Sequence, residues 1–210
     1  MGHHGTGGLF TFNRQMYHSY KITTAPTSEP ITLAEAKAQL RVESDFSDDN
    51  TWITTAITVV REQVEALTNR ALMPQSLELA IGEFEDVMQL PKPPFTSLTS
   101  IQYYDEDNSI QTLASSVYTL NDFVDPAEIA LAYEQTWPTV YDRPDAIRIA
   151  FDTGYADAAS VPASVKQAML MLLTDLYDNR SASTSNFNTV KVNWTPAVLN
   201  LLSTTKAFLY

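Results

Sequence analysis

The 210-residue sequence contains no cysteine, and its three histidines all lie within the first 18 residues. Without cysteine there is no disulfide framework, no thiolate zinc site and no cysteine nucleophile. Without histidine beyond residue 18, the body of the chain has neither a Ser-His-Asp triad nor a helical two-histidine metal motif. We therefore expect no catalytic residues, no metal site and no cofactor.

Basic residues are also scarce. The sequence has 13 Lys and Arg against 25 Asp and Glu, which gives a formal net charge of −12. Such a chain is a poor match for the nucleic-acid backbone, which is bound by clustered lysine and arginine. Charged residues make up 18% of the sequence, below the usual ~25%. This low fraction favours a subunit whose surface is partly covered by neighbours.

No long apolar run is present. The longest is Ala168–Leu173, far short of the ~20 residues that a membrane-spanning helix needs. The first residues also lack the basic region and the apolar region of a signal peptide. We therefore expect a protein that is made and kept in a cytoplasm and has no membrane partner.

Residues 30–73 have a helical pattern. Thr32 and Glu35 form a capping box, which predicts a helix over residues 33–40. A second helix is predicted from about Ser47 to Arg70, because apolar residues recur at helical spacing, and Pro74 is expected to close it. The members of this apolar stripe are Ile53, Ala56, Ile57, Val60, Val64 and Leu67, with Arg61, Glu62 and Glu65 off the stripe.

Residues 75–155 have the short alternating runs of β-strands. Two of these runs flank the turn 105–109, which predicts a hairpin. A third helix is expected over about 163–179. A last helix is expected after Trp194, with Thr195 as its cap and Pro196 at its first position. The predicted strands are 76–81, 87–90, 98–104, 111–113, 117–120, 128–132 and 146–151.

These elements predict an α+β fold. Residues 30–73 and 160–180 are expected to form a small α-helical bundle core, with an antiparallel β unit inserted at 74–159. Residues 1–29 hold four of the six glycines and show no regular period, so we expect an extended N-terminal arm. Residues 181–210 are expected to be a flexible linker and a C-terminal docking helix.

One short motif points to enzyme chemistry. Asp152-Thr-Gly154 follows an apolar strand, as does the Asp-Thr-Gly loop of aspartic proteases, in which two Asp residues share a proton. One copy per chain would require a homodimer. Three common residues make a weak motif, so a strand that ends in an Asp/Gly turn is the interpretation we favour. The acidic run Asp45, Asp48 and Asp49 lacks the Gly and terminal Glu of a calcium loop, and we assign it to the start of a helix.

Six segments form an ordered series along the chain. They are 29–42, 57–72, 90–105, 147–155, 161–173 and 176–180. Together these segments resemble the head–tail connector (adaptor, head-completion) proteins of tailed bacteriophages. No single segment is diagnostic, but six in the same order make a fairly specific match over roughly residues 29–180.

The resemblance implies a structural virion protein and no enzyme. Such proteins form a ring, typically of twelve copies, beneath the portal of a DNA-filled head. The ring extends the DNA channel and provides the platform for the tail or a stopper. The implied partners are other copies of the chain, the portal protein and a tail-side stopper or tail terminator protein, while DNA passes through the lumen without specific binding. The implied location is the virion neck between head and tail, after synthesis in the host cytoplasm.

The resemblance also implies a docking site at the end of the chain. It places the C-terminal segment against the portal, which here is residues 194–210. A short amphipathic helix on a flexible tether can insert into a groove of a partner. The expected anchors are Trp194, Val198, Leu201, Leu202 and Phe208.

Two other functions compete with the connector. One is the homodimeric aspartic protease built on Asp152-Thr-Gly154. The other is an acidic protein-binding module, which would bind a basic protein and form no ring.

Overall fold

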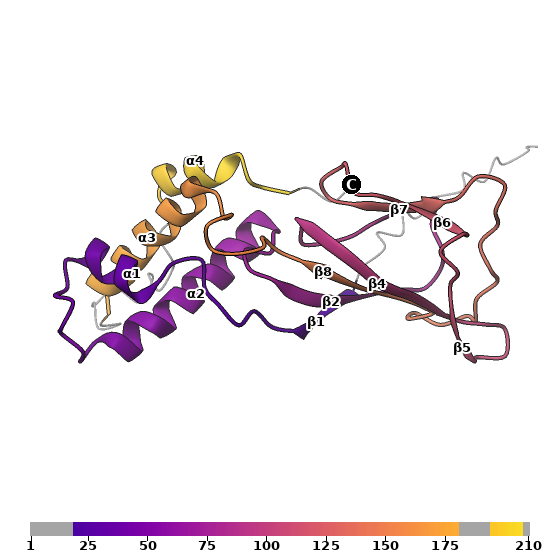
Figure 1. Cartoon of the computed structure of the whole chain (residues 1–210), viewed down its shortest axis with the longest axis horizontal. Helices are drawn as coiled ribbons and strands as arrows, with labels where there is room; N and C mark the ends of the chain where they lie inside the picture. The colour runs from indigo at the N-terminus through magenta and orange to yellow at the C-terminus, as the bar shows by residue number, and fades with distance from the viewer. Residues whose placement is uncertain (1–18, 181–193, 208–210) are drawn as a thin grey trace, which may run out of the picture.

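The structure is a computed structural model that describes residues 19–180 and 194–207. Figure 1 shows an elongated molecule with its helices gathered at one end and its strands at the other. The element order is one strand, two helices, seven strands and two helices. The expected α+β class is confirmed. None of the described helices is long and apolar enough to cross a membrane.

The helical end contains α1 (Leu33–Leu40), α2 (Asn50–Thr68), α3 (Ala163–Asp178) and α4 (Pro196–Ser203). The predicted capping box is present at the start of α1. The Glu35 N–H donates to the Thr32 hydroxyl at 3.1 Å, and the Thr32 N–H donates to the Glu35 carboxylate at 2.7 Å. These two bonds satisfy donors that the first turn of a helix leaves free.

The ends of α2 differ from the prediction. The helix stops at Thr68 because Asn69 adopts the left-handed conformation, with φ of 55°. Asparagine tolerates this conformation and often follows a helix, so the helix ends six residues before Pro74. At the other end Asp49 is the capping residue, but its carboxylate makes no cap hydrogen bond. It accepts hydrogen bonds from Arg180 and Tyr177 instead, which ties α2 to the end of α3.

The strands form two sheets, where the sequence predicted one β unit. The larger sheet has the order β1-β2-β8-β4-β5 and the smaller has the order β3-β7-β6, with antiparallel pairing throughout. The predicted hairpin is the β4–β5 pair. The strands are β1 (Ser19–Thr24), β2 (Gln75–Ile81), β3 (Val87–Gln89), β4 (Phe95–Tyr104), β5 (Ile110–Thr112), β6 (Tyr118–Asn121), β7 (Glu128–Leu131) and β8 (Ile147–Thr153).

The strand β1 lies in the segment expected to be an arm. It pairs with β2 and forms one edge of the larger sheet, and all six of its residues are exposed. Exposure on every residue explains why no alternating pattern marked this strand in the sequence, since neither of its faces enters a core.

Two separate hydrophobic clusters stabilise the molecule. The helical cluster joins α1, α2, α3 and α4, with Val60, Val64 and Leu173 fully buried. The β cluster lies between the two sheets, where Leu79 and Ile149 of the larger sheet meet Ile129 of the smaller one. Alternation along β2 and β8 sends every second side chain into this core.

Candidate functional site

The predicted docking helix is seated on the chain's own helical cluster. Val198 and Leu202 are 1% and 2% exposed within that cluster, and Trp194 and Leu201 are half-buried against it. Phe208, the last predicted anchor, lies outside the described residues. The structure therefore gives Val198 and Leu202 an intramolecular role, and they could reach a partner only if α4 left this position.

Several polar contacts hold the C-terminal segment in place. The Thr195 hydroxyl accepts the Val198 N–H at 3.3 Å, and Pro196 stands at the start of α4, as predicted. Beyond the helix, the Ala207 N–H donates to the Thr68 carbonyl at 2.8 Å. Arg70 donates to the Thr205 carbonyl. The seated helix presents Leu199 outward, at 42% exposure, so this residue is a large apolar side chain of α4 that a partner can reach.

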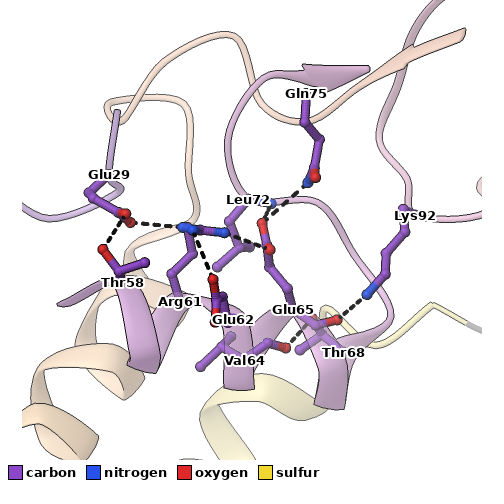
Figure 2. A network of polar contacts seen from close by, with 10 residues as sticks. All are labelled: Glu29, Thr58, Arg61, Glu62, Val64, Glu65, Thr68, Leu72, Gln75 and Lys92. Atoms are coloured by element: carbon purple, nitrogen blue, oxygen red, sulfur yellow. Dashed lines mark hydrogen bonds and ion pairs between the residues drawn. The ribbon is translucent and has the colours of Figure 1, made fainter. Parts of the chain in front are cut away.

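A buried ion-pair network lies where the helices meet the sheets (Figure 2). Arg61 and Glu65, one turn apart on α2, are 6% and 7% exposed and form an ion pair at 2.9 Å. Arg61 also contacts the Glu29 carboxylate at 2.8 Å, and that carboxylate accepts the Thr58 hydroxyl at 2.8 Å. The pair thus fixes the segment that precedes α1 against α2.

Glu65 continues the network toward the sheets. Its carboxylate accepts the Leu72 N–H at 2.7 Å, in the connection between α2 and β2. The Lys92 ammonium, from the loop before β4, donates to the Glu65 backbone carbonyl at 2.8 Å (Figure 2). Burial raises the pKa of the Glu65 carboxyl, although the Leu72 N–H and Arg61 oppose the shift. Burial also lowers the pKa of Lys92. The network joins four segments of the chain and has the character of a structural junction.

The sequence alone does not predict this junction. In the sequence, Arg61 and Glu65 only lie off the apolar stripe of α2. Their spacing of four residues, with opposite charges, was the available signal for an ion pair. That spacing also occurs on solvated helix faces. The pair is buried by segments distant in the chain, such as those of Glu29 and Lys92.

The Asp152-Thr-Gly154 motif is part of the sheet. The Asp152 carboxylate accepts the Ser76 and Ser97 hydroxyls at 2.7 and 2.8 Å from the strands on either side. Thr153 is buried, and its hydroxyl donates to the Pro94 carbonyl at 2.8 Å. Gly154 has φ of +110°, and a Cβ there would lie 2.2 Å from the Met73 carbonyl oxygen. These contacts explain all three residues as a tight crossing between β8 and the chain before β2.

Exposed charge on the described residues is predominantly acidic. Fifteen exposed residues are Asp or Glu, whereas the exposed basic residues are Lys21, Arg41, Arg180 and Lys206. Other cations neutralise carboxylates within the chain, such as Arg148 with Asp145 at 2.7 Å. Within the described ranges, no group of three or more acidic or histidine side chains is arranged to hold a metal ion. The surface therefore repels polyanions, in line with the net charge.

No family model and no curated protein sequence matches the chain. Solved structures do match. A chain in the neck of the empty gene transfer agent (GTA) particle, solved with C6 symmetry, superposes with a TM-score of 0.69. The chain shares the fold of GTA neck proteins.

The likeness to this neck fold covers nearly the whole of each chain. The match to the empty-particle neck spans 91% of this chain and 97% of that chain at 18% identity. A chain of the native GTA virion matches with a TM-score of 0.69, 18% identity and coverage of 91% and 96%. A chain of the native neck with C12 symmetry matches with a TM-score of 0.64, 18% identity and coverage of 91% and 97%. The likeness thus extends over most of the fold and is not confined to one part of it.

Proposed function

We propose that this chain is a structural head–tail connector (adaptor) protein in the neck of a tailed-phage-like virion. It acts as a ring of twelve copies that attaches under the portal, extends the DNA channel and carries a tail-side stopper or tail terminator protein. The observation that supports this most is the neck fold, shared over 91% of the chain with structures of C6 and C12 symmetry.

The charge of the chain supports a channel role. Twelve copies at −12 each carry a total of about −144, and such a field repels DNA phosphates. In a lumen with this net charge, repulsion opposes tight binding of duplex DNA, so the DNA can slide through it. The low charged fraction fits a subunit whose sides contact neighbours in a ring.

Electron microscopy of particles tests the ring. We expect a reconstruction of the neck to show twelve copies of this chain around a lumen wide enough for duplex DNA. A chain found only as monomers or dimers at this locus, or found outside the neck, would contradict the proposal.

Portal docking by residues 194–210 is the second part of the proposal. With α4 seated on the helical cluster, Leu199 is the contact that it offers, while Val198 and Leu202 hold the helix in place. Leu199→Asp is expected to weaken binding to purified portal rings at least tenfold and leave the fold intact. Asn200→Asp, an exposed neighbour that gains the same charge, is the matched control. Equal binding by both variants and the parent chain would refute docking through the seated helix.

The proposed connector performs no catalysis. Asp152 is held by two serines on neighbouring strands, which gives it a structural use. Asp152→Asn is therefore expected to leave particle maturation and every proteolytic product unchanged. Loss of one specific cleavage in this variant would support the protease instead.

A further inference from the structure

Two aromatic side chains stand out from the rest of the surface. Phe123 is 97% exposed and Tyr133 is 89% exposed, whereas the next most exposed large hydrophobic residue, Ile110, is 55% exposed. They lie on either side of β7, Phe123 in the β6–β7 loop and Tyr133 just after the strand. Aromatic residues that a chain leaves uncovered are common anchors at protein interfaces.

The loop that carries Phe123 is firmly held. The Phe123 N–H donates to the Asn121 side chain at 3.3 Å, and Asn121 pairs with Glu128 across β6 and β7. Ala127, on the other side of the tip, is 1% exposed, and its carbonyl accepts the Leu90 N–H at 2.8 Å. A side chain presented by a fixed loop loses little conformational entropy on binding. Phe123 therefore has the support expected of a docking residue.

Arg70 connects this loop to the C-terminal segment. Its guanidinium forms an ion pair with Asp125, two residues after Phe123, and also donates to the Thr205 carbonyl. The segment after α4 runs toward the smaller sheet (Figure 1). In this segment the Ala207 N–H donates to the carbonyl of Thr68, two residues before Arg70. The exposed tip and the end of the described chain thus share one side of the molecule.

The charge around Phe123 and Val124 defines which partner surface can cover them. Asp122 and Asp125 flank the apolar pair Phe123 and Val124, and all four residues are exposed. The nearby cation Arg70 is already engaged by Asp125 and Thr205. Because Asp125 is already paired with Arg70, Asp122 carries the charge that a partner meets. A complementary surface therefore has an apolar pocket with a basic rim that faces Asp122.

We propose that Phe123 and Val124 form a docking knob that inserts into an apolar, basic-rimmed pocket of the portal ring. The knob lies beside the C-terminal segment, so the two form one portal-binding surface, and Arg70 is the positioning residue for both. This inference rests on the proposed connector function.

The test compares two exposed aromatic residues that flank the same strand, β7. Full-length Phe123→Ala and Tyr133→Ala are titrated against portal rings purified from the same particle. Phe123→Ala is expected to weaken binding at least tenfold, and Tyr133→Ala is expected to change it less than twofold. Both side chains contribute little to the fold, because both are almost fully exposed, and circular dichroism of each variant verifies this.

Two further variants test positioning and charge. Arg70→Gln is expected to weaken binding and to reduce the additional effect of Phe123→Ala, because the two residues then act through one surface. Asp122→Asn is expected to weaken binding at low salt and to make it less sensitive to salt. Additive effects of Arg70→Gln and Phe123→Ala would overturn the positioning role.

The remaining outcomes distinguish failure of the knob alone from failure of the connector proposal. If Leu199→Asp weakens portal binding and Phe123→Ala does not, the knob is refuted and the connector stands. If Phe123→Ala prevents ring formation in the absence of portal, measured by native mass spectrometry, the knob contacts a second copy and the portal assignment is overturned. If the parent chain binds no portal rings, the connector proposal and the knob fail together.

Discussion

The two ends of the molecule complete their cores in different ways. At the helical end, the last helix α4 returns and buries Val198 and Leu202 in the cluster, and the most exposed large hydrophobic residue there, Phe46, is 43% exposed. At the β end, two sheets close on each other and leave Phe123 and Tyr133 almost fully exposed. The helical end is covered by its own chain, whereas the β end carries aromatic residues that the chain itself does not cover.

The junction between the two ends is expected to respond most strongly to mutation. Arg61→Ala would leave Glu65 buried without its cation partner, which costs about 4 kcal/mol of the free energy of unfolding. Chemical denaturation followed by circular dichroism measures this loss. If the junction couples the two ends, the variant unfolds in two separate transitions or in one at much lower denaturant.

A neighbouring carboxylate provides the control for the junction. Glu62 also approaches Arg61, at 3.7 Å, but its side chain is 65% exposed. Exposed ion pairs contribute ~0–1 kcal/mol, so Glu62→Ala is expected to have little effect on stability. An equal loss in both variants would show that burial of the pair is unimportant.

The packing of α4 on the helical cluster is tested by Leu202→Ala. This side chain is 2% exposed, and its truncation leaves a cavity that costs about 3 kcal/mol. Leu199→Ala on the outward face of the same helix is expected to change stability by less than about 0.5 kcal/mol. Hydrogen exchange of α4 should become faster in the first variant alone, and unchanged protection there would contradict the seating of α4.

The capping box gives a smaller effect confined to the helical end. Thr32→Ala removes the acceptor for the Glu35 N–H, and loss of such a cap costs about 1 kcal/mol. Thermal unfolding measures the change. Thr32→Ser keeps the hydroxyl and is expected to retain most of the stability, so an equal loss in both variants would argue against the cap.

Acid is expected to act with opposite sign at the junction and at the β end. Arg143 and Arg148 hold the pKa of Asp145 at about 2, so the stability from this carboxylate is present above its ordinary pKa, 3.8, and is lost as the pH falls toward 2. Burial raises the pKa of Glu65, so its contribution is present at acidic pH and is lost as the pH rises through the raised pKa.

A pair of variants isolates the acid effect at the β end. Asp145→Asn is expected to flatten the pH dependence of the unfolding midpoint between pH 4 and 2. Asp142→Asn, at an exposed position in the same loop, is the control. A parent-like pH profile for Asp145→Asn would disprove the assignment of this slope to Asp145.

Local patterns predicted most of the elements. The stripe of α2, the capping box of Thr32 and Glu35, and the Thr195–Pro196 start of α4 appear in the structure because each depends on residues close in the sequence. The division into two sheets could not be predicted, since strand pairing depends on contacts between residues far apart, such as Gln89 with Glu128.

The candidate sites were harder to predict for a related reason. An apolar stripe on α4 looks the same whether Val198 and Leu202 pack on their own chain or on a partner. The burial of Arg61 and Glu65 depends on segments distant in the chain, such as those of Glu29 and Lys92. The exposure of Phe123 depends on the pairing of β6 with β7. Each of these properties is set by tertiary packing, which single-sequence periodicity does not contain.

The connections between the two ends have a mechanical consequence. The backbone crosses the junction three times, between β1 and α1, between α2 and β2, and between β8 and α3. A force that pulls the helices from the sheets is therefore shared by three backbone segments in parallel. The contacts of Arg61 with Glu29, and of Glu65 with Leu72 and Lys92, resist sliding of these segments past one another. In the proposed ring, such a subunit would transmit force along its long axis and resist bending at the junction between the helices and the sheets.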